Sequence, residues 1–166
     1  MNLTHLMPQL RGLHITHVCL TEQQVALAAT AIRRTAMCPL CSRPSRRVHS
    51  TYTRTVVDLP WQLRRVTITL SVRRFFCRNS ACPRRIFCER LPQLVAVHQR
   101  RTVASRTALQ QIGLALGGRA GVRLATPLGM PTSRMTLLRR VRALELPTYA
   151  PPTAVGIDDW AWRKGH

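Results

Sequence analysis

Two closely spaced cysteine pairs constrain the fold of this chain more than any other feature. Cys38 and Cys41 are separated by two residues, and Cys77 and Cys82 are separated by four. Both spacings are typical of ligand pairs in structural zinc sites, where four thiolates surround the ion and leave no position for water. The sequence therefore predicts one structural Zn²⁺ held by these four cysteines.

The cysteines also allow other interpretations. Cys88 or His49 could replace Cys82 as the fourth ligand, because four intervening residues is the long end of the usual range. One pair could instead be a redox dithiol, although the βαβ context of such enzymes is absent. Cys19 lies outside both pairs and is expected to be a small buried hydrophobic residue.

A β-hairpin is predicted between the two cysteine pairs. Apolar and polar residues alternate from Arg65 to Arg73, and this period of two indicates a half-buried strand. Its apolar members are Val66, Ile68, Leu70 and Val72. Pro60 marks the turn from the preceding strand, "TVVDL". A lone hairpin is only marginally stable in water, so the metal would hold it together as a zinc ribbon.

The chain is strongly basic, with 26 Lys and Arg residues, six acidic residues and a formal net charge of +20. Lys164 is the only lysine, and GC-rich coding alone would favour arginine. A charge of this size nevertheless opposes a compact monomer unless a polyanion relieves the repulsion. Arginine binds phosphates and guanine edges in a forked geometry, so nucleic acid is the expected partner.

Membrane and secretory signals are absent from the sequence. There is no apolar run of about 18 residues, and the first residues lack the pattern of a signal peptide. We therefore expect a cytoplasmic protein with no membrane partner. Its cysteines should be reduced, which favours metal binding over disulfides.

Residues 91–146 are rich in leucine, alanine and arginine, a composition that predicts helices. No Asp or Glu lies between Glu89 and Glu145, whereas ten arginines do. An ordinary solvated helix mixes both signs of charge, so we interpret this region as a face that meets phosphate.

Within this region, residues 121–140 fit a helix-turn-helix, preceded by a supporting helix, "VASRTALQQIGLAL", that ends at Gly117-Gly118. Ala125 suits the crossing of two helices, and Gly129 suits the turn. The expected core positions are Leu124, Leu128, Met130, Met135 and Leu138. Thr132 or Ser133 would cap the second helix. The side chains expected to meet DNA are Ser133, Arg134, Thr136, Leu137, Arg139, Arg140 and Arg142. A plain helical hairpin is the alternative, and Pro127 counts against the helix-turn-helix.

These observations predict an α+β protein in five segments. A small β-rich zinc ribbon is followed by an all-α helix-turn-helix domain and the beginning of a further domain. The segments are a β-rich lead-in (1–37), the zinc-ribbon-like domain (38–90), the helix-turn-helix domain (91–146), a proline-rich linker (147–153) and a C-terminal stub (154–166). In the lead-in, "QQVALAATAIRR" is either a strand or a short helix.

This order of parts resembles the transposases of the ISL-three family of bacterial insertion sequences. The matching stretches are "CPLCSRPSRRVHSTYTRTVVDLPW", "RRFFCRNSACPRRIFCERLP" and "VGIDDWAWRKGH", and the resemblance covers nearly the whole chain from Cys38 onward. It implies that the zinc domain and the helix-turn-helix recognise the ends of the element. It also implies a following RNase H-like catalytic domain, in which an Asp-Asp-Glu triad binds two metal ions. Asp158 matches the first of these carboxylates.

The resemblance implies that this chain is the N-terminal DNA-recognition portion of an insertion-sequence transposase, truncated after Asp158. We expect it to have no enzymatic activity of its own, and Mg²⁺ to be a cofactor only of the full-length parent. A second copy of the chain or the full-length transposase is a further candidate partner. The alternatives are a stand-alone DNA-binding regulator or inhibitor of transposition, and a remnant gene fragment without activity.

Overall fold

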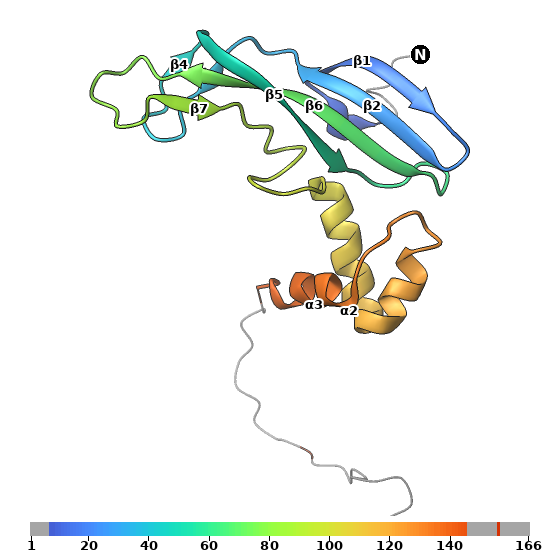
Figure 1. Cartoon of the computed structure of the whole chain (residues 1–166). Helices are drawn as coiled ribbons and strands as arrows, with labels where there is room; N and C mark the ends of the chain where they lie inside the picture. Colours follow the sequence, from blue (N-terminus) through green and yellow to red (C-terminus); the bar gives the residue numbers. More distant parts are fainter. Residues whose placement is uncertain (1–6, 146–155, 157–166) are drawn as a thin grey trace, which may run out of the picture.

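The computed structural model describes residues 7–145 and residue 156, and it places a β-sheet beside a group of short helices (Figure 1). The elements in chain order are η1 (Pro8–Leu10), β1 (Leu13–Leu20), β2 (Gln24–Ala31), β3 (Ala36–Met37), β4 (Pro44–Ser45), β5 (Val48–Val57), β6 (Arg65–Phe76), β7 (Ile86–Cys88), α2 (Val103–Ala125) and α3 (Arg134–Arg142). The predicted mixture of a β-rich part followed by helices is confirmed. In the described part of the chain, no helix is long and apolar enough to cross a membrane.

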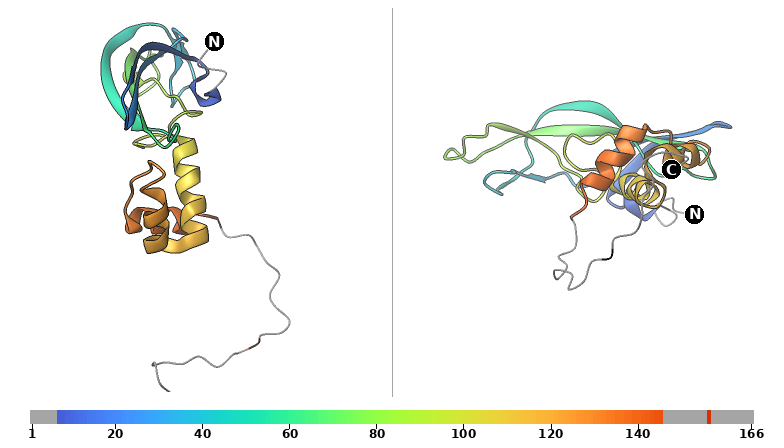
Figure 2. Two further views of the ribbon diagram at one scale, coloured as in Figure 1. Left: turned by 90° about the vertical axis from the view of Figure 1, so that its right-hand side faces the viewer. Right: turned by 90° about the horizontal axis from the view of Figure 1, so that it is seen from below.

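Strand β6 is the centre of a five-stranded sheet. The strand order is β1-β2-β6-β5, and β7 pairs with the last residues of β6, from Arg74 to Phe76. β5 and β6 are antiparallel, which confirms the predicted hairpin, whereas β2 runs parallel to β6. Strands β3 and β4 form a separate small hairpin. Figure 2 shows that the large sheet is strongly curved.

One face of this sheet carries the larger hydrophobic core. The residues from β6 are Val66, Ile68, Leu70 and Val72, each at most 3% exposed. They are the apolar members of the predicted alternation. η1 and residues 91–95 cover the same face, and they contribute Leu10, Leu94 and Val95. The core therefore draws on segments from both sides of the cysteine-bearing region.

The segment "QQVALAATAIRR" forms strand β2, so the helical alternative is excluded. Its buried residues are Val25, Leu27, Ala29 and Ala31. This spacing of two places them all on one face of a strand, whereas a helix would have buried every third or fourth residue.

The lead-in and the zinc-ribbon segment share one sheet, because β1 and β2 continue the sheet of β5 and β6. They are parts of one folded unit. The expectation that Cys19 is buried is wrong, since its side chain is exposed. Cys19 lies opposite Ala26, whose neighbours Val25 and Leu27 enter the core, so Cys19 is on the other face of the sheet.

Gly117 divides α2 into two helical segments, 103–116 and 118–125, because its φ of 68° and ψ of −161° are not helical. The bend is visible in Figure 1 and falls where the supporting helix was predicted to end. α3 follows Ser133, whose side chain accepts a hydrogen bond from the backbone N–H of Thr136. The predicted cap is therefore confirmed. The segments enclose a second core formed by Leu109, Ala125, Met130 and Leu137.

Asp58 joins the sheet to the helices. Its side chain is 1% exposed and accepts hydrogen bonds from Thr102 Oγ1 at 2.5 Å and from Gln9 Nε2 at 2.9 Å. Thr102 Oγ1 in turn accepts the backbone N–H of Ser105 and caps α2. The backbone N–H of Thr102 donates to the carbonyl of Val57, so the start of α2 is fixed to the end of β5.

The substitution Gly129→Ala should lower the free energy of unfolding by about 3 kcal/mol, because it adds both backbone strain at a positive φ and a steric clash. Gly129 has a φ of 78°, and a Cβ added there would lie 2.5 Å from the backbone oxygen of Leu63. Urea unfolding measures the loss. Gly12→Ala is the control, since Gly12 has a φ of 81° but nothing within 4 Å of the added Cβ. It should cost only about 1–2 kcal/mol. Equal losses would contradict the close contact with Leu63.

Candidate metal centre and basic surface

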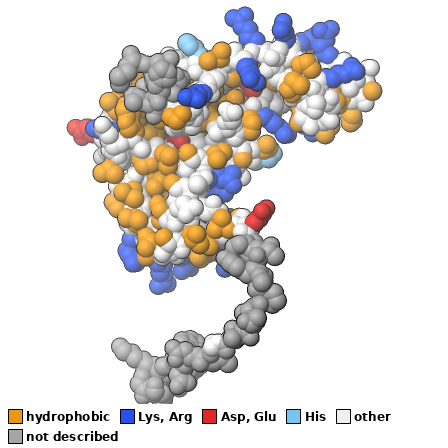
Figure 3. Space-filling view, turned by 180° about the vertical axis from the view of Figure 1, so that it is seen from behind, with side chains coloured by type: hydrophobic (Ala, Val, Ile, Leu, Met, Phe, Trp, Pro, Cys, Tyr) orange, Lys and Arg blue, Asp and Glu red, His pale blue; other side chains and the backbone are white. Residues whose placement is uncertain are grey.

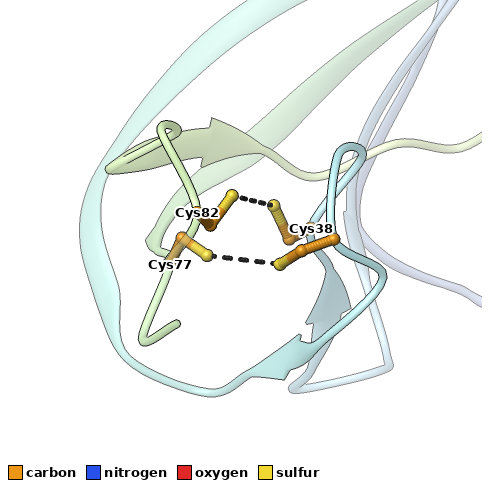
Figure 4. A group of neighbouring side chains, drawn as sticks. Cys38, Cys77 and Cys82 are labelled. Carbon is orange, nitrogen blue, oxygen red and sulfur yellow. Dashed lines mark hydrogen bonds between the residues drawn. The ribbon is translucent and has the colours of Figure 1, made fainter. Parts of the chain in front are cut away.

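The four predicted zinc ligands come from two loops at one end of the sheet, and Figure 4 labels three of them, Cys38, Cys77 and Cys82. The loop between β3 and β4 carries Cys38 and Cys41, and the loop between β6 and β7 carries Cys77 and Cys82. β5 and β6 separate the two loops in sequence, and the antiparallel pairing of these strands returns the chain to the same end. The structure therefore brings together the four cysteines that the spacing selected.

Local hydrogen bonds shape both loops. In the first, the backbone N–H of Ser42 donates to the carbonyl of Cys38 at 2.9 Å. In the second, Asn79 accepts two backbone N–H groups, that of Cys82 on its carbonyl and that of Ala81 on its side-chain oxygen. Such tight turns direct both thiols of a pair to one point.

The sulfur positions fit a tetrahedral ion. All four Sγ atoms lie within 4.8 Å of one another. The Sγ atoms of Cys38 and Cys82 are 4.0 Å apart, and those of Cys41 and Cys77 are 3.6 Å apart. Zn–S bonds of about 2.3 Å require sulfur separations of about 3.8 Å in a tetrahedron. The same distances are too long for a disulfide, whose sulfurs are about 2.05 Å apart.

An aromatic cluster packs against the metal site, in which Cys38 and Cys82 are buried and Cys41 and Cys77 are partly exposed. The side chains of Cys38 and Cys82 are 1% and 3% exposed, and they pack with Phe75 and Phe87. The two rings are stacked, with their centroids 5.9 Å apart. Four cysteine ligands are the feature of a structural zinc site, in which the ion holds the fold and does not catalyse.

The acidities of the thiols suit cation binding. The backbone N–H of Arg43 is the main reason that the pKa of Cys41 is lowered to about 6. The backbone N–H of Asn79 favours the thiolate of Cys77, but burial and hydrogen bonds with the other cysteines outweigh it and raise the pKa of Cys77 to about 12. Cys41 is therefore ionised at neutral pH without metal. A bound cation would be needed to ionise Cys77, since coordinating thiols are deprotonated.

The alternative fourth ligands lie outside this cluster. His49 is exposed, and its ring packs edge-on against Phe76 at a centroid distance of 4.9 Å. Cys88 is exposed on β7. Among the described residues, the converging group consists of the four paired cysteines. The geometry therefore favours Cys82 over His49 and Cys88.

The loops, the hairpin and the four cysteines define a zinc-ribbon-like metal centre. Residues 34–82 match a family model described as the zinc-finger of transposase IS204/IS1001/IS1096/IS1165. This segment holds all four cysteines and is less than a third of the chain. The match supports the resemblance to the ISL-three transposases and indicates a structural zinc ion. No curated protein and no solved structure matches the chain.

Arginine side chains surround the metal centre, as Figure 3 shows for the arm that extends from the body of the molecule. The exposed ones in this region are Arg43, Arg46, Arg47, Arg78, Arg84 and Arg85. Arg47 stacks over Phe76 at 5.0 Å, and Arg74 stacks over Tyr52 at 4.6 Å. Stacking holds a guanidinium group in place while its edge N–H groups can still bind phosphate.

The residues predicted to meet DNA lie on or beside α3, which Figure 2 shows on the outside of the helical part. Those that are exposed are Ser133, Arg134, Arg139 and Arg142, while Thr136 and Arg140 are partly buried. The prediction for Leu137 is wrong, because its side chain is 0% exposed. It packs in the second core beside Gly121, where an added Cβ would lie 2.7 Å from Leu137 Cδ1.

The predicted core positions of this region are corrected in the same way. Leu124 and Met135 are 43% and 47% exposed, whereas Met130 is buried as expected. Leu128 and Leu138 are partly buried. The face of α3 that meets α2 is therefore centred on Leu137, two positions from Met135.

Four of the predicted DNA contacts, Ser133, Thr136, Arg139 and Arg140, also have partners within the protein. Arg139 Nε donates to the carbonyl of Met135 at 3.3 Å, and the hydroxyls of Ser133 and Thr136 are hydrogen-bonded to each other. Arg140 donates to Gln99 Oε1 at 3.3 Å, and burial, with Arg106 and Arg139 nearby, lowers the pKa of Arg140. Ser133 Oγ accepts the N–H of Thr136 at 3.2 Å. Arg134 and Arg142 are exposed at the two ends of α3 and are better placed to meet a ligand.

The expected catalytic residue, Asp158, lies outside the residues that the structure describes. The same is true of the predicted linker, 147–153, and of the predicted stub apart from Gly156. Their predicted roles stay predictions.

The substitution Cys38→Ser should remove the bound zinc and unfold the metal end, since structural zinc contributes about 10 kcal/mol or more to such folds. Elemental analysis after gel filtration should find one zinc per wild-type chain and none in the variant. Cys88→Ser is the control, because Cys88 is exposed and outside the cluster. A full zinc content in Cys38→Ser would contradict the assigned ligand set.

Proposed function

We propose that this chain is the N-terminal DNA-recognition portion of an insertion-sequence transposase. In this proposal it binds the double-stranded DNA of the element ends through its zinc ribbon and a helix-turn-helix. The observation that carries the proposal is the match of residues 34–82 to a transposase zinc-finger. The convergence of the four cysteines within this segment supports it.

Residues 118–142 would form the helix-turn-helix. The segment 118–125 packs against α3 through Ala125, which is 0% exposed, and the intervening turn contains Gly129 with its φ of 78°. Gly118 and Gly121 allow α3 to approach closely, since an added Cβ at either would meet an α3 side chain within 3.4 Å. This arrangement leaves the arginine-bearing face of α3 exposed, as a recognition helix in a major groove requires.

The distribution of charge supports the same function. Acidic residues are absent between Glu89 and Glu145, so no carboxylate of that segment opposes the arginines of α3. At the cysteine-bearing end of the sheet, Glu89 Oε1 forms an ion pair with Arg73 Nη2 at 2.5 Å, and the side chain of Glu89 is only 6% exposed. In Figure 1, α3 projects toward the same side as the metal end. One duplex could therefore contact both basic surfaces, namely the arginines around the four cysteines and the arginines of α3.

Affinity for duplex DNA should fall steeply between low and high salt, because arginine–phosphate contacts release counterions. Arg134→Ala should weaken binding to the element end by about 1–3 kcal/mol if Arg134 contacts a base edge, and less on unrelated DNA. Fluorescence anisotropy at several salt concentrations measures both effects. Arg140→Ala should cause a similar loss of affinity and should also remove the hydrogen bond from Arg140 to Gln99.

Arg11→Ala is the control for these substitutions, because Arg11 is exposed beside η1, away from α3 and the metal end. It should leave the affinity nearly unchanged. An affinity independent of salt would contradict DNA binding through arginine. If Arg134→Ala lowered the affinity equally for element-end and unrelated DNA, Arg134 would contact the DNA backbone and not a base edge.

We also propose that this chain does not cut DNA by itself. Two-metal phosphoryl transfer needs several carboxylates around ions about 3.5–4 Å apart. Of the acids upstream of Asp158, Asp58 is buried in hydrogen bonds with Thr102 and Gln9, and Glu89 is paired with Arg73. Neither is available to a catalytic site.

Purified chain incubated with element-end DNA and Mg²⁺ or Mn²⁺ should therefore leave the DNA bound and intact, as a denaturing gel would show. Asp158→Asn should behave identically. Specific nicking by the wild type that disappears in Asp158→Asn would overturn this reading. It would mean that a complete catalytic site forms, for example between two copies.

A further inference from the structure

A cleft of about 400 Å³ lies between the sheet and residues 89–98, the segment that covers the sheet and leads to α2. Its inner side is apolar and is formed by Leu70, Val72 and Val95, which are at most 6% exposed. Tyr52 and Arg54 of β5 also line it. The volume lies within the range of about 300–1,000 Å³ that is usual for small-ligand sites.

Two arginines and one histidine line the exposed side of the cleft. Arg84 comes from the loop beside the metal centre, and Arg90 and His98 come from the segment that covers the sheet. All three are exposed. Glu89 also lines the cleft, but its carboxylate is bound to Arg73. A cleft with an apolar floor and two arginines, Arg84 and Arg90, on its exposed side fits a ligand with a flat, uncharged ring and an attached anionic group.

The cleft also lies next to the proposed recognition helix. Gln99, directly after His98, accepts Arg140 on its side chain and Arg54 on its carbonyl. Figure 3 shows the molecule hollowed between the arm that carries the four cysteines and the helical part. A duplex that contacts both basic surfaces would pass close to the entrance.

His98 has a φ of 59°, a left-handed conformation that costs a non-glycine residue energy. The next residue, Gln99, is hydrogen-bonded to Arg54 and Arg140, and strained residues gather at ligand sites. The strain therefore coincides with the rim of the cleft.

We infer that this cleft binds one unpaired nucleotide of the bound DNA, with the base against the apolar floor and the adjoining phosphates at Arg84 and Arg90. A base that stays paired in the duplex stack cannot enter a cleft of about 400 Å³ between the sheet and residues 89–98, so the base must leave the stack. Proteins that hold an extrahelical base use apolar and aromatic walls of this kind. This inference rests on the proposed DNA binding.

The test compares two labelled duplexes that differ by a single extra, unpaired nucleotide in one strand. Wild-type chain should bind the bulged duplex at least about fivefold more tightly, since burying one base against apolar side chains contributes this much and no pairing has to be broken. Fluorescence anisotropy at one salt concentration measures both affinities.

Two pairs of variants locate the effect. Ala96→Trp fills the cleft and should abolish the preference, whereas Gln93→Trp adds the same ring to an exposed position of the same segment outside the cleft and should keep it. Arg90→Ala should reduce the preference, whereas Arg100→Ala, exposed but not at the rim, should not. If Ala96→Trp does not fold, the comparison of Arg90→Ala with Arg100→Ala tests the proposal on its own.

The possible results separate the two proposals. Equal wild-type affinities for the two duplexes, or a preference that survives in both Ala96→Trp and Arg90→Ala, would overturn the role of the cleft while leaving DNA binding intact. Absence of binding to either duplex would overturn the proposed function itself, and the cleft with it.

Discussion

The buried carboxylate of Asp58 holds the sheet, the N-terminal turn and the first long helix in one arrangement. A buried charge is tolerated only when hydrogen bonds replace its water, and Thr102 and Gln9 supply them from two distant parts of the chain. Asp58 also lies at the N-terminus of α2, where the helix dipole favours a negative charge. In a chain with only six acids, this one fixes the direction in which the helices leave the sheet. The position of α3 relative to the metal end depends on it.

Local patterns predicted the parts of the fold that local interactions determine. The period of two in β6, the spacing of the cysteines and the Ser133 cap each depend on residues close in sequence, and the structure places them as expected. Contacts between distant segments were not predicted. The parallel pairing of β2 with β6 leaves no local signal, so the lead-in could not be recognised as part of the same sheet. Leu137 was misplaced for a similar reason, since the choice of buried face on a short helix depends on its neighbour.

Gln99 links the two basic surfaces. Its side chain accepts Arg140 of α3, and its carbonyl accepts Arg54 of the sheet. The segment around it also contributes Leu94 and Val95 to the core beneath β6. Because this segment is anchored on both sides, the distance between the metal end and α3 is set by packing and hydrogen bonds, not by a flexible connection. A ligand that touches both surfaces would meet a preformed spacing, which lowers the entropic cost of binding.

The parallel pairing of β2 with β6 has a consequence for the order in which the chain folds. Thr30 pairs with Ser71, so these strands can meet only after the long intervening segment has been closed, and closing a loop costs entropy that grows with its length. The cysteines lie just beyond both strand ends, at Cys38 and Cys41 after β2 and at Cys77 and Cys82 after β6. Metal binding would join those ends first and leave only a few residues on each side to align. The ion would thus favour the parallel pairing of β2 with β6, and so stabilise the whole sheet and not only the loops that hold the ion.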